Sequence, residues 1–307
     1  WHAMGQGATT GSLVVTLEAL KEMHLTPEDI QLIQNDTKTC PDTGMAGASR
    51  SLYMDGNATI IAANKLLAAM RKEDGTLRTY DEMKAEGIET KYLGRYETNT
   101  TPGLCRLDPN TGIGDPTPAF TYCLNLAEVE VDTKTGKTTV LKFTCVDFVG
   151  RIGNIDAVNG QAYSGIMHGI GFALKEDYAD VKKHANMFGA GTSYIKDVPD
   201  DINLIHIDGA ISDGPFGSSG ASEAFQASGH CAVLNGIYNA CGVRIHEIPA
   251  LPEKVKAGLD AIAKGEKPYE PKKYFLGSDM YEELENIKEN PVQVGTQSFY
   301  VSLDDPT

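Results

Sequence analysis

Glycine in this chain is concentrated in short loops that stand directly before helical patterns. The chain has 307 residues and 32 glycines, against roughly 21 for an average usage of about 7%. Three loops stand out, at residues 5–7, 44–51 and 217–220. Backbone N–H groups at a helix start bind anions, so these loops predict binding sites for phosphate or another anion. Each loop taken alone also fits ordinary turn chemistry.

Acidic residues outnumber basic ones, which limits the possible partners. There are 42 Asp and Glu against 27 Lys and Arg, a formal net charge of −15, and no basic cluster. Nucleic acid and anionic membrane surfaces are therefore poor partners. No apolar run approaches the roughly 20 residues of a membrane-spanning helix.

The six cysteines are scattered and form no CxxC pair. The usual spacings of a zinc ribbon or an iron–sulfur cluster are absent, and buried thiols in a reducing compartment are favoured. The chain begins with Trp1 rather than Met, so we expect a fragment or a processed piece. We expect a cytoplasmic location and leave a periplasmic one open, because a missing signal peptide says little here.

Hydrophobic periodicity and capping signals predict helices. They are expected at residues 8–23, 49–71, 155–174 and 222–241, and beginning at Thr79 and near Pro252. Residues 36–48 lack periodicity, and long ordered loops of this kind tend to be functional. Glycines at 160, 165, 169 and 171 predict that the helix at 155–174 packs closely against another backbone segment.

Alternating apolar residues predict strands. A hairpin is expected with strands at residues 120–131 and 138–149, followed by a strand at 202–207, and a short strand is expected at 30–33. The fold class is therefore α+β. We assign residues 1–263 to one domain and residues 264–307 to a charged tail with one acidic helix, Asp279 to Glu289, because apolar periodicity weakens after about Lys264.

Standard catalytic motifs fail when tested. The Gly5–Gln6–Gly7 loop has Thr10 in place of the third glycine of a dinucleotide fingerprint, and there is no GxxxxGK[ST], HExxH or GxSxG. Nicotinamide, ATP, zinc-protease and esterase interpretations are therefore excluded. His246 and Glu247 are not followed by a continuing helix, so no metal pair is expected there, and His168 is interpreted as a core or supporting residue.

Glu223 is the carboxylate of most interest. It lies in the first turn of a predicted helix, directly after a loop rich in Ser and Gly. Spacing alone favours a structural role, in which Glu223 complements the helix dipole or accepts from the free amide near Gly220. Gln6 and Gln161 are equally neutral when taken alone.

Seven short segments occur in a characteristic order. They are MGQG at 4–7, ASRS at 48–51, AEVEVD at 127–132, NGQ at 159–161, HGIG at 168–171, GPFGSSGASE at 214–223 and IPALPEKV at 248–255. Together they resemble the C-terminal, molybdopterin-binding part of the xanthine oxidase family of molybdenum hydroxylases, and bacterial aldehyde oxidoreductases in particular. The resemblance covers about residues 1–263 and implies the second molybdenum-binding domain, with mixed sheets and packed helices.

The resemblance implies a site. In this family the molybdenum is held by the dithiolene of a pterin cofactor, so no protein side chain is expected as a metal ligand. Glu223 corresponds to the family's general base, which we expect to be buried beside the anionic cofactor. The expected cofactor-binding residues are Gln6, Gly7, Ser49, Arg50, Ser51, Gln161, Ser218, Ser219 and Gly220.

The implied activity is oxidation of a small-molecule aldehyde to a carboxylic acid with water as oxygen source. The alternatives are hydroxylation of a purine or another N-heterocycle, and a non-catalytic paralogous assembly subunit. The last is favoured by Ala221 and Ser222, which stand where the family pattern has Val-Gly.

The resemblance also implies a cofactor form and partners. Bacterial relatives use molybdopterin cytosine dinucleotide. The 2Fe-2S clusters are expected in absent domains or in a partner, beside the N-terminal half of the molybdenum domain. We expect an oligomer.

Overall fold

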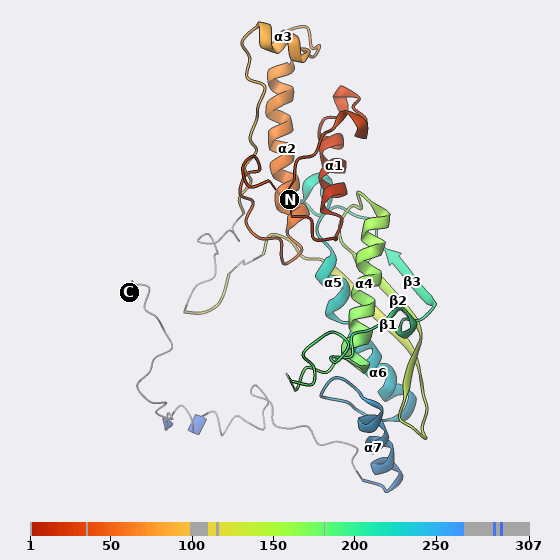
Figure 1. Cartoon of the computed structure of the whole chain (residues 1–307). Coiled ribbons are helices and arrows are strands. Elements are labelled where there is room, and N and C mark those ends of the chain that lie inside the picture. The colour runs from red at the N-terminus through yellow and green to blue at the C-terminus, as the bar shows by residue number, and fades with distance from the viewer. Residues whose placement is uncertain are drawn as a thin grey trace. The chain divides into compact units, whose positions relative to one another are not determined.

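The computed structural model describes residues 2–34, 36–98, 110–114, 117–180, 182–266, 285–286 and 289–290 (Figure 1). The chain divides into two compact units, Trp1–Pro268 and Tyr269–Thr307, and the elements below belong to the first. The acidic helix expected at 279–289 lies almost entirely outside the described residues, and the tail from residue 264 stays a prediction.

Helices form the N-terminal part of the first unit. Helix α1 (Ala8–Ala19) packs against α2 (Ser51–Met70), and a short helix, α3 (Tyr80–Ala85), follows. Two 3-10 turns, Lys21–Met23 and Pro27–Asp29, lie between α1 and α2. Apolar contacts of Leu20, Ala63 and Leu67 hold the pair together. The predicted helices are confirmed, except that the first ends at Ala19 and is followed by a 3-10 turn rather than continuing to Met23. Residues 36–48 form the expected loop.

The short strand expected at residues 30–33 is wrong, because this segment is irregular. A short apolar run becomes a strand only where a neighbouring strand offers hydrogen-bond partners. The described strands all belong to one sheet, formed from residues 122–206, and the 30–33 segment does not join it.

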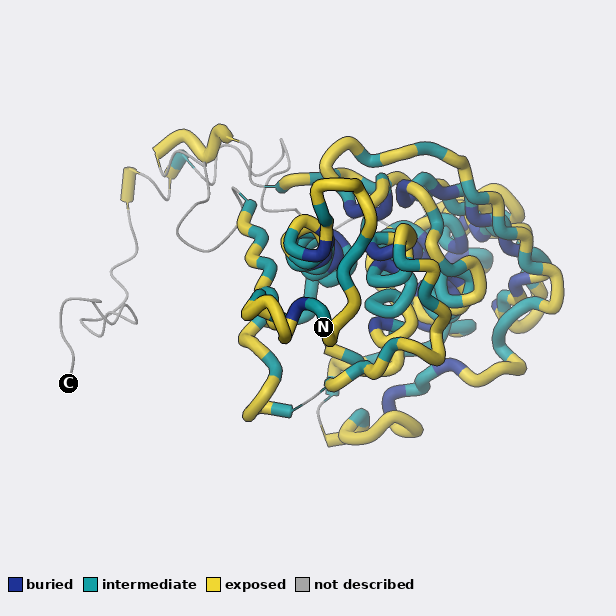
Figure 2. The backbone as a smooth tube through the Cα atoms, turned by 90° about the horizontal axis from the view of Figure 1, so that it is seen from above, coloured by how far each residue is buried: buried dark blue, intermediate teal, exposed yellow. Residues whose placement is uncertain are grey.

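That sheet has three strands in the order β1-β2-β3. Strands β1 (Tyr122–Val131) and β2 (Thr138–Phe148) form the predicted antiparallel hairpin, and β3 (Asp201–His206) pairs with β2 in parallel. Helices α4 (Ile155–Leu174) and α6 (Gly229–Cys241) supply the core on one face of the sheet. Figure 2 shows the buried positions, in dark blue, inside this part of the chain.

The helix expected at 222–241 is two helices. Helix α5 (Ser222–Ala227) ends at Ser228, whose backbone is not helical, and α6 begins at Gly229. The Ser228 hydroxyl accepts a hydrogen bond from the Asn125 side chain of β1 at 3.0 Å. The break lies beside Gly229, which closely approaches Gly169 of α4, so two contacts with distant segments meet at this point. The last helix, α7 (Pro252–Ala263), begins at the predicted proline.

One end of the other face of the sheet is apolar and exposed. Leu124 is 63% exposed and Ile205 is 44% exposed, and the register places both strands beside Val146 of β2. Toward the hairpin turn the same face becomes polar, and Lys142 pairs with Asp201 at 3.2 Å. Where one face of a sheet meets water, the side chains on that face are normally polar. This face therefore has the character of an interaction surface.

The cysteines only partly follow the expectation of buried thiols. Cys145 is buried and Cys40, Cys123 and Cys241 are partly buried, all without a disulfide. Cys231 is exposed, so the expectation is wrong for this residue, which lies on a solvent-facing side of α6. Cys105 lies outside the described residues.

Glycines allow α4 to approach other backbone segments. A Cβ atom at Gly165 would lie 2.6 Å from the Cβ of Phe225 in α5, and one at Gly169 would lie 2.9 Å from the Cα of Gly229 in α6. The predicted close packing is confirmed at these positions. At Gly160 it is wrong, because nothing lies within 4 Å of an added Cβ there.

Two alanine variants in this helix separate packing from helix propensity. We expect Gly165→Ala to lower the free energy of unfolding by about 1–3 kcal/mol through overpacking. Gly160→Ala, the matched control, is expected to raise it by about 0.5–1 kcal/mol, since alanine loses less entropy in a helix. Urea unfolding of the full chain measures both, and equal effects of the two variants would contradict this packing.

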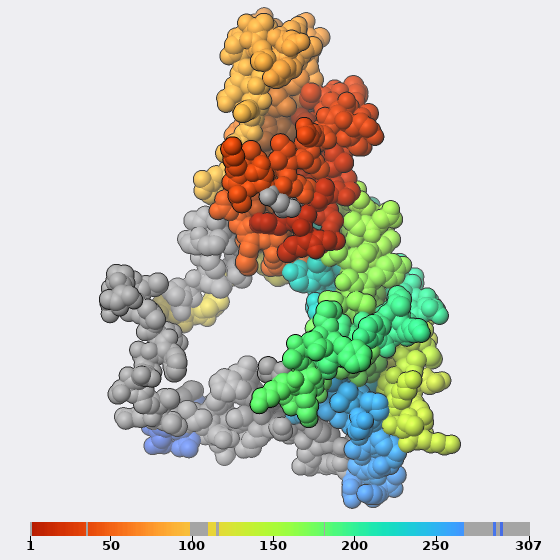
Figure 3. Space-filling model, viewed as in Figure 1, coloured from red at the N-terminus to blue at the C-terminus, as the bar shows by residue number. Residues whose placement is uncertain are grey.

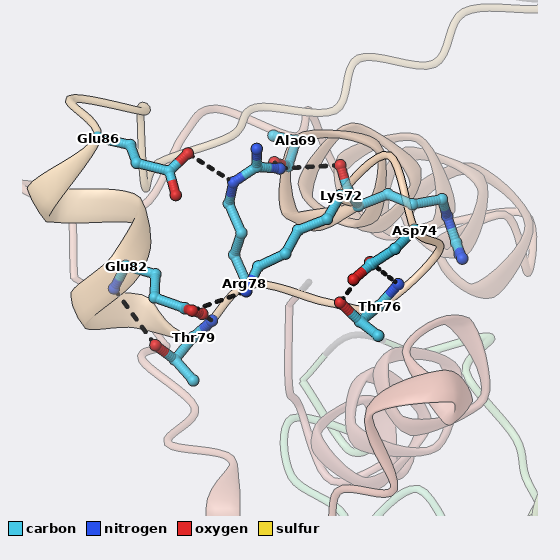
Figure 4. A network of polar contacts seen from close by, with 9 residues as sticks. Ala69, Lys72, Asp74, Thr76, Arg78, Thr79, Glu82 and Glu86 are labelled. Carbon is cyan, nitrogen blue, oxygen red and sulfur yellow. Dashed lines mark hydrogen bonds and ion pairs between the residues drawn. The ribbon is translucent and has the colours of Figure 1, made fainter.

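A polar network joins the end of α2 to α3 (Figure 4). The Glu82 carboxylate accepts from the Lys72 ammonium at 2.7 Å and from the Thr79 backbone N–H at 2.7 Å. Arg78 donates to Glu86 at 2.8 Å. The hydrogen bonds from Lys72 and from the Thr79 backbone lower the pKa of Glu82 from 4.5 to about 2. Glu82 thus completes the predicted capping box with Thr79.

This network predicts a pH dependence of stability. A carboxyl group whose pKa is lower in the folded than in the unfolded protein stabilises the folded state. This stabilisation is fully present above the unfolded pKa of 4.5 and is lost as the pH falls toward the folded pKa of about 2. Glu82→Gln is therefore expected to lower the unfolding temperature at pH 6 and to have a smaller effect at pH 2.5. Glu73→Gln, an exposed neighbour, is the control, and an effect of Glu82→Gln that does not shrink on acidification would contradict the prediction.

Candidate functional site

A pocket of about 550 Å³ lies where the glycine loops meet. Its walls come from the segment before α1, the loop before α2, the start of α4 and residues 215–223. Figure 3 shows the red N-terminal segment against the green α4 region and the cyan segment that leads to α5. Segments far apart in the sequence therefore form one site.

The structure brings nearly all the predicted site residues to this pocket. Its lining includes Gln6, Gly7, Ser49, Ser51, Gln161, Ser218, Ser219, Gly220 and Glu223. Arg50 does not line the pocket, because its guanidinium lies against Gly44 of its own loop. The functional role of each of these residues stays a prediction.

Three long helices begin at the pocket. Helix α1 follows Gly7, whose φ of 88° lies in the left-handed region, and α2 follows Arg50. Neither α1 nor α2 has a side-chain cap or an acidic residue in its first turn. In α4, Asn154 accepts from the Ala157 N–H at 3.0 Å. The uncapped starts of α1 and α2 place backbone N–H groups and positive dipole ends at the pocket, which suits an anion.

Gln6 is held by its own segment. Its side-chain oxygen accepts from the Met4 N–H at 2.6 Å, and its amide nitrogen donates to the His2 carbonyl at 2.6 Å. Both ends of the side-chain amide are therefore used by backbone groups in the MGQG segment. The Gln6 side chain thereby stiffens the loop that forms this wall of the pocket.

Gln161 is linked to the segment beside Glu223. The Ser222 hydroxyl donates to the Gln161 side-chain oxygen at 2.7 Å, which joins α5 to α4. Ser222 departs from the family pattern, and its hydroxyl is accommodated by this hydrogen bond inside the pocket.

Glu223 faces the pocket and is exposed in this chain, and its burial beside a bound cofactor stays a prediction. It lies in the first turn of a six-residue helix at the rim of the pocket. Its carboxylate accepts a hydrogen bond from the Ser49 hydroxyl, and the Glu223 N–H donates to the same hydroxyl at 3.2 Å. Its place in the first turn of α5 fits the part of the structural interpretation in which Glu223 complements the helix dipole. The expected hydrogen bond from the amide near Gly220 is not formed, because Ser49 is the partner of the carboxylate.

Arg151 is a pocket residue that the sequence analysis missed. It lines the cavity together with two carboxylates, Glu18 and Glu223. Its backbone N–H donates to the Gly217 carbonyl at 2.9 Å, beside a bridge between Gly150 and Ser218. No local sequence signal marks Arg151, because its place at the pocket depends on contacts with the distant Gly217 and Ser218 segment.

His168 was interpreted as a core or supporting residue, and its place in the core is wrong. It is exposed on α4 and lies near the Phe172 ring, outside the pocket. Within the described part of the chain, no three His, Cys, Asp or Glu side chains form a metal-binding group. No helix among the described residues is long and apolar enough to cross a membrane.

The fold and the pocket define a domain that binds an anionic cofactor at glycine-rich helix starts. The family model described as "Molybdopterin cofactor-binding domain" matches residues 1–199. The chain belongs to this family, within the xanthine oxidase family of molybdenum hydroxylases. A molybdenum–pterin cofactor fits the residues present, because uncapped helix starts, serine hydroxyls and one arginine are suitable partners for its phosphate.

Known proteins resemble the chain over most of its length. The aldehyde oxidoreductase of Megalodesulfovibrio gigas is 42% identical over 261 residues, which cover 85% of this chain and 28% of the relative. The solved structure of Desulfovibrio gigas aldehyde oxidoreductase has a TM-score of 0.80 and 42% identity over 84% of this chain and 28% of that chain. The probable hypoxanthine oxidase of Escherichia coli is 28% identical over 85% of this chain and 29% of the relative.

The chain therefore spans less than a third of these relatives' length. The α+β fold predicted from the sequence, that of the molybdenum-binding domain, is confirmed by the structural match.

Proposed function

We propose that this chain is the cofactor-binding part of a molybdenum hydroxylase that oxidises an aldehyde to a carboxylic acid with water as oxygen source. The observation that carries the proposal is the single pocket that joins Glu223 to Gln161 and to the uncapped helix starts. The higher identity to an aldehyde oxidoreductase favours an aldehyde over a purine as substrate.

The chain's own residues would hold the cofactor through backbone and hydroxyl donors. When bound, the molybdenum–pterin group supplies the redox centre that accepts two electrons from the substrate. The N–H groups at the starts of α1 and α2 and the hydroxyls of Ser218 and Ser219 would bind its phosphates. The cytosine dinucleotide form is part of this proposal, as is a cytoplasmic location.

Glu223 would act as the general base. Its Oε2 atom accepts the Ser49 hydrogen bond, so we assign proton uptake from the attacking water to Oε1. The side chain lies at the rim of the pocket, where it can reach a reacting group. A base in this position is worth about 10²–10⁴ in rate.

Glu223→Gln tests this assignment. Turnover of an aldehyde by the molybdenum-loaded enzyme is expected to fall by about 10²–10⁴-fold, because glutamine cannot take the proton. Molybdenum content, measured by mass spectrometry of the metal, is expected to stay unchanged. Glu253→Gln, a first-turn carboxylate of α7 outside the pocket, is the matched control and should turn over normally.

Two results would count against the proposal. Normal turnover in Glu223→Gln would remove the catalytic role. A stably assembled enzyme without molybdenum would support the alternative of a non-catalytic assembly subunit. That alternative is suggested by Ser222, which stands where the family pattern has glycine.

The partner in this proposal is the remainder of the hydroxylase. The relatives are more than three times as long as the matched segment, and the apolar sheet face needs a cover of comparable character. We propose that the N-terminal half of the molybdenum domain packs on this face, and that the iron–sulfur clusters lie in the same partner or in a further one. Burial of Leu124 and Ile205 would provide the apolar contact.

Leu124→Glu tests the docking face. Leu124 is exposed, so its replacement is expected to change the stability of the chain alone by less than about 0.5 kcal/mol. The yield of the assembled complex is expected to fall at least tenfold, because a charge would be buried at the interface. Leu124→Met, which keeps the apolar character, should assemble normally. Wild-type yield in Leu124→Glu, measured by co-purification, would exclude this face.

A further inference from the structure

Ser49 adopts an uncommon backbone conformation at the pocket. Its φ is 52°, and the preceding Ala48 has a φ of 53°. Residues other than glycine rarely occupy this left-handed region, and such strain is concentrated at functional sites. The tertiary structure must therefore hold Ser49 in place against its local preference.

The segment before α5 supplies that restraint. A Cβ atom at Gly220 would lie 1.6 Å from the Ser49 carbonyl oxygen, so this approach is open only to glycine. The Glu223 N–H then donates to the Ser49 hydroxyl at 3.2 Å, and that hydroxyl donates to the Glu223 carboxylate. Ser49 and residues 220–223 thus contact each other through both backbone and side chains.

The hydroxyl of Ser49 is consequently committed to Glu223. A serine hydroxyl has a single proton to donate, and here the carboxylate accepts it. Phosphate and pterin oxygens that accept hydrogen bonds would need the same proton. The Ser49 side chain therefore cannot donate to the cofactor while it donates to Glu223.

We infer that Ser49 is a positioning residue for Glu223, in place of the cofactor-holding role implied by the family resemblance. The inference rests on the proposed function of Glu223. An exposed glutamate samples several rotamers, and the Ser49 hydroxyl selects one of them by binding Oε2. This leaves Oε1 directed for proton uptake.

The test uses the molybdenum-loaded enzyme with Ser49→Gly and Ser49→Asn. Glycine accepts the left-handed backbone and removes the hydroxymethyl side chain with its hydroxyl, so folding should be retained. We expect kcat per molybdenum to fall about 10- to 100-fold, the effect of losing a hydrogen bond to a charged group, while KM and molybdenum content change less than twofold. Asparagine also tolerates this conformation and offers an amide donor, so it should recover part of kcat.

Controls separate the hydroxyl from other effects. His24, which has a φ of 51° and lies outside the pocket, provides the matched variant His24→Gly, with unchanged kcat and molybdenum content. The double variant Ser49→Gly with Glu223→Gln is expected to be no slower than Glu223→Gln alone, because residues that act as a unit are not additive.

Three outcomes would overturn the inference. One is a Ser49→Gly enzyme that loses molybdenum but keeps its kcat per molybdenum, which would restore Ser49 as a cofactor ligand. Another is unchanged kcat and molybdenum content, and the third is an additive double variant. If Glu223→Gln itself turns over normally, the proposed function fails instead, so the two failures are distinguishable.

Discussion

Close contact between backbone segments is the constraint on which this structure depends. Helix α4 approaches α5 at Gly165 and α6 at Gly169, and the loop before α5 approaches Ser49 at Gly220. In each case a side chain would occupy space that another segment already fills. Part of the glycine excess is therefore explained by segments that cross closely, and one of these crossings, at Gly220, lies in the pocket where most of the site residues meet.

The same arrangement explains how an acidic chain can bind an anion. With a net charge of −15, long-range electrostatics oppose an anionic ligand. The pocket offsets this repulsion locally. Helices α1 and α2 begin there without side-chain caps, so their dipoles present positive ends, and Arg151 adds one positive charge. Dipoles and a single charge act over short range, so binding depends on the geometry of the loops more than on the overall charge.

The sequence predicted helices and strands correctly where their formation depends on residues that are close in the sequence. The capping box at Thr79 and Glu82, the hairpin at residues 122–148 and the helix at 155–174 depend on neighbours in the sequence, and all are confirmed. The strand at 30–33 failed because pairing requires a distant partner. The break at Ser228 was not predicted, and it lies where the chain meets Asn125 of β1 and Gly169 of α4, both distant in the sequence.

The sequence by itself determined the fold class, the glycine loops and the ordered segments that identify the family, because these depend on local propensity and on residues read in order. Only the tertiary structure decided which groups touch. It placed Arg50 away from the pocket and Arg151 in it. It also left Glu223 exposed and made its carboxylate the acceptor of the hydrogen bond from the Ser49 hydroxyl. Such pairings depend on the meeting of chain segments that are distant in sequence, which spacing along a single segment does not encode.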